Sequence, residues 1–255
     1  MAHMKILDCT LPSPAQNLAC DEALLDLCEA GFDHDILRFW EPREHFVVLG
    51  YSSRIRAEVE LSRCRAGRIA ILRRCSGGGT VLQGPGCLNF SLILRLDAST
   101  RPAGLPAGLK GPELLTTISG TTRFVMETHR TALEPVIGGA VAVAGFSDLA
   151  RNGLKFSGNA QRRKRRAALV HGTFLLGLDL RLIEEVLPLP ERQPPYRGNR
   201  PHREFLANLR VPAGAIKQVL AAAWRAAEPF GDPPLPQIEA LVRERYATEA
   251  WTFRW

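Results

Sequence analysis

A run of glycines within residues 73–92 (RRCSGGGTVLQGPGCLNFSL) is the stretch of this sequence best suited to chemistry. In the Ser-Gly-Gly-Gly run at 76–79, successive backbone N–H groups have no side chains to block an approaching anion. Such N–H groups bind phosphates and carboxylates, and Arg73 or Arg74 could add a forked, charge-assisted contact. The alternative is a hairpin or bulge that uses glycine for its own turn. The spacing fits neither a P-loop nor a dinucleotide fingerprint.

A second candidate cluster lies within residues 148–161 (DLARNGLKFSGNAQ). Asn152-Gly153 is a strong turn signal, so Lys155 is predicted to begin the returning strand. Residues 157–160 (SGNA) are predicted to form a second small-residue loop that a ligand could approach. Lys155 is then either a solvated edge residue or a cation that neutralises a phosphate or polarises a carbonyl.

Two further features have simpler explanations. His171 lies on the apolar stretch LVHGTFLLGLDL, where a single histidine is more often a buried, hydrogen-bonded residue than a catalyst. The basic run Arg162 to Arg166 could contact nucleic acid or an acidic protein, but few aromatic residues accompany it. We therefore interpret it as a solvated turn and expect no nucleic-acid partner.

The composition is that of a globular protein with an acidic partner. The 255 residues are 45% hydrophobic and 23% charged, and the formal net charge of +7 favours nucleotide phosphates or an acidic protein as a partner. No apolar run reaches the length of a transmembrane helix, so no membrane association is expected. Six cysteines without a C-x-x-C pair indicate free thiols in a reducing cytoplasm and disfavour zinc. Residues 1–3 resemble a cloning remnant.

Helical and strand-like patterns alternate irregularly along the chain. We predict an α/β fold (α+β, with a mixed sheet) in a single domain over residues 4–255. The segments expected to be helical are 15–30, 54–66, 112–130, 181–187, 213–227 and 236–247. Strands are expected at 36–40, 46–50, 68–73, 88–96 and 136–145, and in LKFSGNAQRR and LVHGTFLLGLDL, whereas 98–112 and 188–203 are expected to be loops.

Five ordered motifs together resemble the lipoate–protein ligase A family, which is related in fold to biotin–protein ligases. The motifs are Asn17-Leu18-Ala19 with Asp21-Glu22, then RFWEPREHFVVLGYS, RRCSGGGTVLQGPGCLNFS, SDLARNGLKFSGNAQRR and LVHGTFLLGLDL. The tail TEAWTFRW also resembles a late element of the family. The resemblance spans most of residues 15–253, and five motifs in the right order make it specific.

The resemblance implies a particular reaction. Such enzymes use ATP with Mg²⁺ to activate lipoate or octanoate to an acyl-adenylate, and pass the acyl group to a lysine of a lipoyl-domain protein, such as an E2 subunit or the glycine-cleavage H protein. Many relatives carry an additional C-terminal domain or a separate small accessory subunit, so this chain is expected to be the catalytic domain alone. The long acyl chain requires an apolar pocket, for which Val81, Leu88 and Phe90 are candidates.

The same resemblance implies roles for individual residues. Lys155 matches the family's catalytic lysine, which contacts the phosphate and the carbonyl oxygen. Asp148 matches an acidic residue beside the adenylate, where Mg²⁺ is also expected. The remaining matched positions, all expected to bind the acyl-adenylate or ATP, are Arg74, Ser76, Gly77, Gly78, Gly79, Thr80, Val81, Asn89, Gly158, Ala160, His171 and Gly172.

Two alternatives remain open. Related octanoyltransferases take their acyl group from a preformed donor through a thioester on a cysteine, but Gly145 and Ala168 stand at the two positions where such relatives carry that cysteine. Adenylate chemistry is therefore preferred over thioester chemistry. The remoter alternative is a basic protein that binds nucleic acid through Arg162 to Arg166 and leaves the glycine loop unexplained.

Overall fold

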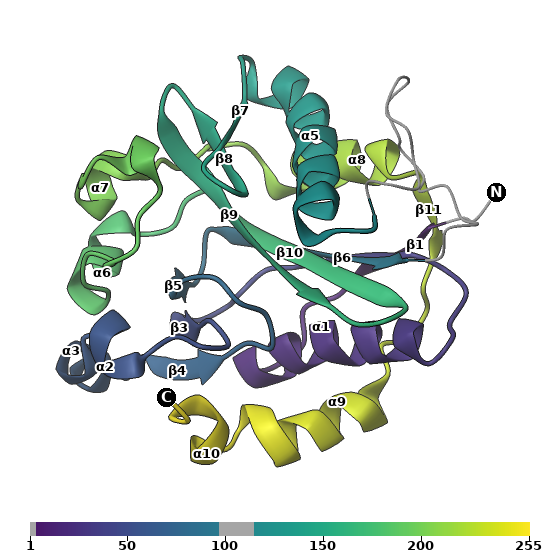
Figure 1. The fold of residues 1–255 in the computed structure, drawn as a ribbon, viewed down its shortest axis with the longest axis horizontal. Coiled ribbons are helices and arrows are strands. Elements are labelled where there is room, and N and C mark those ends of the chain that lie inside the picture. Colours follow the sequence, from purple (N-terminus) through teal and green to yellow (C-terminus); the bar gives the residue numbers. More distant parts are fainter. Residues whose placement is uncertain (1–3, 97–114) are drawn as a thin grey trace.

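The computed structural model describes residues 4–96 and 115–255. An eight-stranded sheet has the order β11-β1-β2-β6-β10-β9-β8-β7, and a three-stranded sheet of order β4-β3-β5 lies beside it (Figure 1). The strands are β1 (Met4–Asp8), β2 (Ile36–Trp40), β3 (Phe46–Leu49), β4 (Ala70–Arg73), β5 (Val81–Gln83), β6 (Cys87–Arg95), β7 (Ala142–Ala144), β8 (Asp148–Arg151), β9 (Leu154–Arg163), β10 (Ala167–Leu175) and β11 (Ala226–Pro229). The sheet is mixed, because β1 runs parallel to β2 and β11 while the centre is antiparallel.

Helices cover both faces of the large sheet. The helices are α1 (Pro14–Glu29), α2 (Ile55–Glu58), α3 (Leu61–Ala66), α5 (Ile118–Ile137), α6 (Leu180–Val186), α7 (His202–Phe205), α8 (Ala213–Ala223), α9 (Leu235–Leu241) and α10 (Glu249–Thr252), with a 3-10 turn at Pro195–Arg197 and a π-helical turn at Val242–Tyr246. Figure 1 places α5 and α8 on one side of the sheet and α1 and α9 on the other. Central strand β6 is therefore buried along nearly its whole length.

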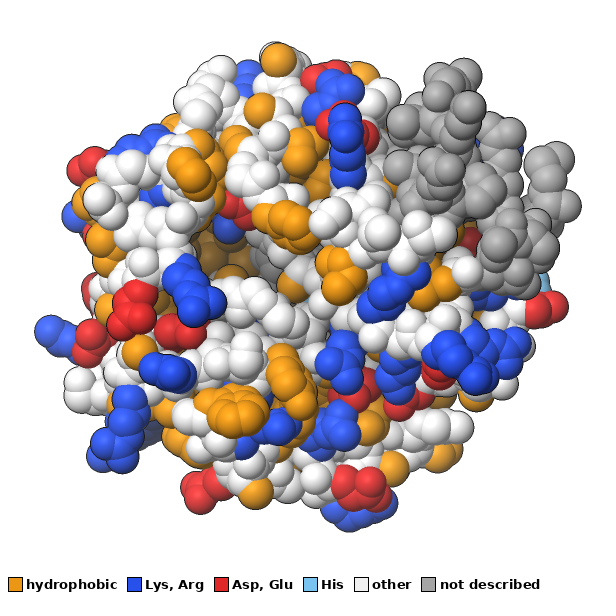
Figure 2. All heavy atoms as spheres, in the orientation of Figure 1, with side chains coloured by type: hydrophobic (Ala, Val, Ile, Leu, Met, Phe, Trp, Pro, Cys, Tyr) orange, Lys and Arg blue, Asp and Glu red, His pale blue; other side chains and the backbone are white. Residues whose placement is uncertain are grey.

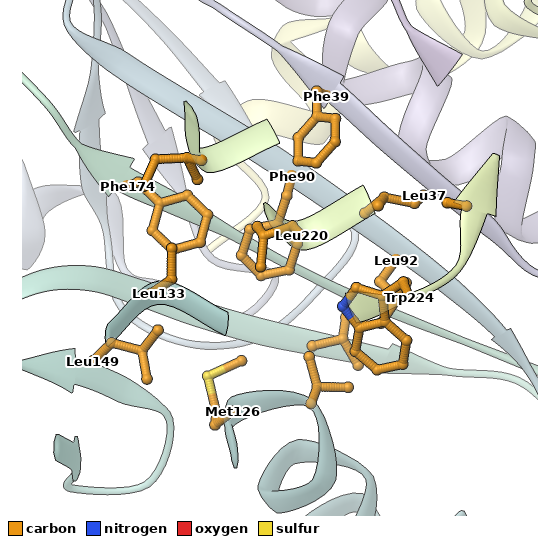
Figure 3. Packing of buried hydrophobic residues seen from close by; sticks show 14 of the residues in the cluster. Leu37, Phe39, Phe90, Leu92, Met126, Leu133, Leu149, Phe174, Leu220 and Trp224 are labelled. Atoms are coloured by element: carbon orange, nitrogen blue, oxygen red, sulfur yellow. The ribbon is translucent and has the colours of Figure 1, made fainter. Parts of the chain in front are cut away.

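The core on the α5 side is built from alternating residues of the central strands. Phe90 of β6 stacks on Phe174 of β10, with ring centroids 5.4 Å apart (Figure 3). Phe124 of α5 meets Trp224 edge to face. All four side chains are at most 1% exposed. Because one face of β6 and β10 is held by this core, their other face is fixed in register for the site described below.

Local signals explain where the main helices begin and end. Ser13 caps α1 and forms a capping box with Gln16, and Pro14 occupies the first turn. Helix α5 begins after Thr117, whose side chain accepts a hydrogen bond from the Gly120 N–H, and ends at Gly138 in the left-handed region. Within the described residues, no helix is both long and apolar enough to cross a bilayer.

The mixed-sheet α/β prediction is confirmed, and so are most of its elements. The helix expected at 15–30 and the strands expected at 36–40, 46–50 and 88–96 match α1, β2, β3 and β6 within a few residues. The strands LKFSGNAQRR and LVHGTFLLGLDL correspond to β9 and the β10 segment. The predicted loop at 98–112 lies outside the described residues.

Several predicted boundaries are wrong. The segment 136–145 is not one strand, because α5 continues to Ile137 and only Ala142–Ala144 pairs in the sheet. The predicted helix at 213–227 ends at Ala223, and Ala226–Pro229 pairs with β1 as an edge strand. The helix predicted over 54–66 is two short helices, α2 and α3. The SGNA segment at 157–160 is no loop: its residues lie in β9 and pair with β10.

Candidate active site

A cavity of about 1090 Å³ opens between the two sheets, and Figure 2 shows a hollow on this face, left of centre, with hydrophobic side chains at its rim. Its volume lies just above the usual range for small-molecule sites. Strands β5, β9 and β10, the glycine run and the segment 187–206 supply its walls. Of the residues predicted for the site, those lining the cavity are Arg74, Gly77, Gly78, Gly79, Thr80, Val81, Asn89, Asp148, Lys155, Gly158, Ala160, His171 and Gly172.

The glycine loop, residues 76–80, presents free backbone donors to this cavity. Within the described part of the chain, the N–H groups of Gly77, Gly78 and Gly79 have no hydrogen-bond acceptor, whereas the Thr80 N–H donates to the Glu58 carboxylate at 3.2 Å. A Cβ built at Gly77 or Gly79 would meet no atom within 4 Å. Packing of the protein therefore does not require glycine at positions 77 and 79. A ligand that approaches the backbone closely would require glycine there.

Arg74 holds the glycine loop in shape. Its side chain is buried and donates to the carbonyl oxygens of Gly77, at 2.6 Å, and Gly79, at 2.9 Å, and to the Ser76 hydroxyl at 3.0 Å. Burial lowers the pKa of Arg74 to about 10, so it stays charged at neutral pH. Arg74 thus binds two carbonyl oxygens of the loop, whereas the N–H groups of residues 77–79 have no acceptor among the described residues.

Arg73 supports the same loop from behind. It is fully buried and donates to the carbonyl oxygens of Gly50 at 2.7 Å, Ser53 at 2.9 Å and Thr252 at 2.8 Å. Burial, followed by the nearby charge of Arg254, lowers the pKa of Arg73. Arg73 thus ties α10, near the end of the described chain, to the strand that enters the loop.

Behind the loop lies a buried polar chain that includes Ser76 and His171. The Ser76 hydroxyl lies 2.6 Å from His171 Nε2, His171 Nδ1 lies 3.2 Å from Asp21 Oδ2, and Arg38 donates to Asp21 Oδ1 at 2.6 Å. The contacts have the order of a Ser-His-Asp triad. Ser76, however, has no exposed surface, does not line the cavity, and accepts from Arg74. The chain therefore fixes the position of the loop, and the Ser76 side chain is not placed to contact a ligand.

Asp21 makes stability depend on pH. Burial alone would raise the pKa of Asp21, but the Arg38 charge and the His171 hydrogen bond outweigh it and hold the pKa below its ordinary value. The carboxylate therefore contributes stability above its unfolded pKa, and the contribution is lost as pH falls through the folded pKa. Asp21→Asn should lower the free energy of unfolding in urea by about 3–5 kcal/mol at neutral pH, and by less in acid. Asp26→Asn, which breaks a half-exposed pair with Lys164, is the control; equal losses in both variants would contradict this role.

Lys155 and Asp148 form an ion pair at the opposite wall of the cavity. Lys155 Nζ lies 2.8 Å from Asp148 Oδ1, and the Tyr196 hydroxyl donates to Asp148 Oδ2 at 2.8 Å. The turn predicted at Asn152-Gly153 is confirmed by left-handed φ values of 52° and 75°, and it places both residues on adjacent strands. The Lys155 side chain is 25% exposed and crosses Gly158, where an added Cβ would lie 2.9 Å from Cε and from Nζ.

Segment 187–206 supplies a second cation to the cavity, Arg197. Arg197 is 4% exposed, lines the cavity and donates through Nε to the Arg200 carbonyl oxygen at 3.0 Å. Its Nη2 has no acceptor among the described residues. Burial is the main cause that lowers the pKa of Arg197. A buried guanidinium with a free donor is suited to an anionic ligand.

The cavity lining combines apolar side chains with a closed polar network. Asn89 donates to Gln83 at 3.0 Å, Gln83 donates to Thr173 at 2.6 Å, and Thr173 donates to Asn89 at 2.5 Å, so these groups satisfy one another. Of the predicted acyl-pocket residues, Val81 and Phe90 line the cavity, whereas Leu88 is wholly buried outside it. The other apolar lining side chains include Leu18, Trp40, Val48, Leu82, Val170, Leu175 and Ile183.

None of the six cysteines lines the cavity. Cys75 and Cys87 flank the glycine loop, but both are buried, and burial raises the pKa of each thiol to about 12. At Gly145, φ is +56° and an added Cβ would lie 3.1 Å from the Pro194 side chain. A nucleophilic thiolate needs access to the substrate and a low pKa, and the thiols of Cys75 and Cys87 have neither.

The described residues offer a weak fit for a protein-bound metal ion. They contain no group of three or more His, Cys, Asp or Glu side chains that could hold one. Asp148, the predicted Mg²⁺ ligand, is one carboxylate whose two oxygens already accept from Lys155 and Tyr196. Mg²⁺ commonly needs only one or two protein carboxylates when substrate phosphates supply the other ligands, so the assignment to Asp148 stays a prediction.

Sequence reasoning missed four of the polar residues at this site. Tyr196 and Arg197 lie in the Pro- and Arg-rich segment that was expected to be a loop, and nothing in its pattern indicated that it borders the cavity. Glu58 and Gln83 belong to no sequence pattern that indicates a binding site. Asp21 was noticed only as part of a family motif. A carboxylate among the apolar residues of α1 was nevertheless a signal, because a buried charge needs a charged or hydrogen-bonding partner.

Comparisons with known proteins agree with this geometry. The family model described as the lipoyl protein ligase A/B catalytic domain matches residues 13–221. In sequence, the chain is similar to the octanoyltransferase LipM of Brevibacillus brevis, with 26% identity over 95% of both chains. It is also similar to a probable lipoate-protein ligase A of Mycoplasma pneumoniae, with 27% identity over 94% of this chain and 68% of that protein.

Solved structures share the fold. A lipoate-protein ligase A bound with ATP superimposes with a TM-score of 0.81 at 22% identity, over 99% of both chains. A bi-partite lipoate protein ligase of Thermoplasma acidophilum, from work that included its E2 lipoyl domain, gives a TM-score of 0.79 at 22% identity, over 99% of this chain and 97% of that one. At this identity the likeness is one of fold.

Proposed function

Because this chain belongs to the lipoyl protein ligase A/B catalytic domain family, we propose that residues 4–255 form one catalytic domain that activates lipoate or octanoate with ATP. The acyl group then passes to a lysine of a lipoyl-domain protein. The observation that carries the proposal is the free N–H row of the glycine loop facing the Lys155–Asp148 pair across one cavity. Both anions of the activation step require such donors.

The proposed chemistry has two displacement steps. In the first, a carboxylate oxygen of the acid attacks the α-phosphorus of ATP, and pyrophosphate leaves with the bonding electron pair. In the second, the neutral amine of the acceptor lysine attacks the acyl carbon, AMP leaves, and the amine loses a proton. The glycine-loop N–H groups hold the mixed anhydride, and the Lys155 ammonium offsets charge on the phosphate and on the developing oxyanion.

Other residues that line the cavity are suited to bind the phosphates of ATP and the hydrocarbon chain of the acid. The free Nη2 of Arg197 is suited to a phosphate of ATP or the departing pyrophosphate. The apolar side chains that line the cavity, such as Val81, Leu82 and Ile183, would bind the hydrocarbon chain of the acid. Mg²⁺ would enter on the phosphates of ATP, with Asp148 as its protein ligand, and offset phosphate charge when bound.

A second candidate is acyl transfer from a preformed donor, which is favoured by the similarity to LipM octanoyltransferases. A thioester mechanism of that kind requires an accessible thiol. The burial of Cys75 and Cys87, and the glycine at position 145, support the adenylate route instead. A separate accessory subunit for the activation step is also compatible with the proposal.

Two donor assays separate these functions. The protein is incubated with a lipoyl domain and either lipoate, ATP and Mg²⁺, or octanoyl–acyl-carrier protein alone, and the acceptor mass is recorded. We expect a gain of one lipoyl group with ATP only. If ATP fails, synthetic lipoyl-adenylate tests the second step by itself. Transfer from the acyl-carrier protein with a trapped thioester would support the second candidate, and no transfer from any donor would reject both.

Gly158 should control the position of the catalytic ammonium. In Gly158→Ala the new methyl group would lie 2.9 Å from Lys155 Cε and Nζ, so the side chain must move off its present path. We expect acyl-adenylate formation, measured by pyrophosphate exchange, to fall about tenfold or more with little change in thermal stability. Gly153→Ala cannot serve as the control, because Gly153 has a positive φ. The control is Ala150→Gly on the neighbouring strand, which removes a methyl group rather than adding one. An unchanged exchange rate in Gly158→Ala would show that the ammonium position is not critical.

A further inference from the structure

Beside the glycine loop lies an aromatic–arginine surface formed by Tyr51, Arg162, Trp251, Arg254 and Trp255. The Arg254 guanidinium carbon lies 4.7 Å from the Tyr51 ring centroid, 4.9 Å from that of Trp251 and 5.0 Å from that of Trp255. Arg162 reaches the Tyr51 ring from β9, at 5.5 Å. Trp255 is 54% exposed. Three segments far apart in the sequence thus meet in one surface cluster, in which Arg162, Arg254 and Trp255 are exposed and the two other aromatic side chains are half-buried.

This surface is attached directly to the loop that faces the cavity. The Tyr51 N–H donates to the Ser76 carbonyl oxygen at 2.8 Å, and the Trp255 indole donates to the Tyr51 carbonyl oxygen at 2.9 Å. On β9, Arg162 lies two residues beyond Ala160, which lines the cavity. Figure 2 shows hydrophobic and Lys or Arg side chains gathered below the hollow on the same face. A macromolecule bound there would border the cavity mouth.

The charge of this surface is not balanced by the protein. Among the described residues, neither Arg162 nor Arg254 forms an ion pair with a carboxylate. In contrast, Lys164, Lys217 and Arg203 all have acidic partners. The charge of Arg254 also contributes, after burial, to the lowered pKa of Arg73 beneath it. The two free guanidiniums therefore complement an acidic surface.

We propose that the aromatic–arginine surface is the docking site for an acidic face of the protein that receives the acyl group. The proposal rests on the proposed function, because the acceptor lysine must enter the cavity while the rest of its domain remains outside. The exposed Trp255 side chain supplies contact area, and the guanidiniums supply charge complementarity and steer the encounter. Single-stranded nucleic acid is the competing ligand for aromatic and basic residues. It is disfavoured because guanidiniums already stack on Tyr51 and Trp251.

Charge reversal tests the docking site separately from catalysis. In the full chain, Arg254→Glu and Arg162→Glu are compared with Arg243→Glu. The control side chain, Arg243, is 71% exposed, and its one ion pair among the described residues is with its neighbour Glu244. Acceptor KM is measured with a lipoyl domain at low and high salt, and adenylate formation is measured by pyrophosphate exchange without acceptor. We expect the KM to rise about tenfold or more in the first two variants, to respond less to salt than in the wild type, and to stay unchanged in the control. Exchange should be equal in all.

Other results lead to different conclusions. Equal KM values in Arg254→Glu and Arg243→Glu, with normal exchange in both, would overturn the docking site and leave the proposed function intact. If the wild type shows no exchange, the same KM comparison is made with synthetic lipoyl-adenylate, and failure of that donor too would refute the proposed function and the docking site together. Tight binding of a single-stranded oligonucleotide, lost in Arg254→Glu while the acceptor KM is unchanged, would assign the surface to nucleic acid. Arg254→Lys should retain most of the wild-type affinity, because it keeps the charge.

Discussion

Replacing Lys155 with alanine should lower the rate of acyl-adenylate formation by about 100- to 1000-fold, the loss typical of removing one preorganised donor from an anionic transition state. The ammonium is held 2.8 Å from Asp148 and lies over Gly158, so its position is defined before any ligand binds. The loss should appear in the rate constant more than in the KM for lipoate. Pyrophosphate exchange with lipoate and ATP measures it without the acceptor.

The matched control for this variant is Lys217→Ala. Lys217 also pairs with carboxylates, those of Asp8 and Glu41, but it does not line the cavity. Its removal should leave exchange within about twofold of the wild type, because surface ion pairs contribute little even to stability. If Lys155→Ala retained full activity, the glycine loop would have to stabilise the anions without a facing cation, and the proposed mechanism would be wrong.

Replacing Gly77 with valine should abolish measurable adenylate formation, a loss of about 100-fold or more, while the protein remains folded. The added Cβ would meet no described atom within 4 Å apart from its chain neighbours, so the substitution should strain the unliganded protein little. The added side chain would instead occupy the space next to the free N–H groups that a ligand must enter. Thermal unfolding and pyrophosphate exchange, measured on one preparation, separate the two effects.

Gly214→Val provides the control, because a Cβ at Gly214 also meets nothing within 4 Å but that residue lies in α8, away from the cavity. Both variants should unfold at nearly the wild-type temperature, and only Gly77→Val should lose activity. Normal exchange in Gly77→Val would favour the simpler explanation, in which the glycines serve a tight turn and bind no anion.

Local sequence signals predicted those parts of the site that depend on nearby residues. The Asn152-Gly153 turn fixed the start of β9 and hence the place of Lys155, because both residues adopt positive φ. The uncovered amides of Gly77 and Gly79 followed from the absence of side chains alone. In both cases the controlling interaction lies within a few residues, and a pattern in the sequence can therefore report it.

The elements that the sequence did not predict depend on contacts between distant parts of the chain. Ala226–Pro229 contains a proline and no alternation, yet it is a strand because β1 offers it an edge. The small residues at 157–160 suggested a loop, but β10 pairs with them throughout. The same limit applies to the site: the partners of Asp148 are Lys155 from the next strand and Tyr196 from a distant segment.

The contacts of Arg73 have a consequence for how the protein matures during translation. Its guanidinium binds the carbonyl oxygens of Gly50 and Thr252, which are supplied by early and late parts of the chain. While Thr252 still lies within the ribosomal tunnel, which holds about 30 residues or roughly 100 Å of extended peptide, it cannot bind Arg73. The glycine loop should therefore remain open to proteases until Thr252 has left the tunnel, even though the residues of the loop emerge much earlier.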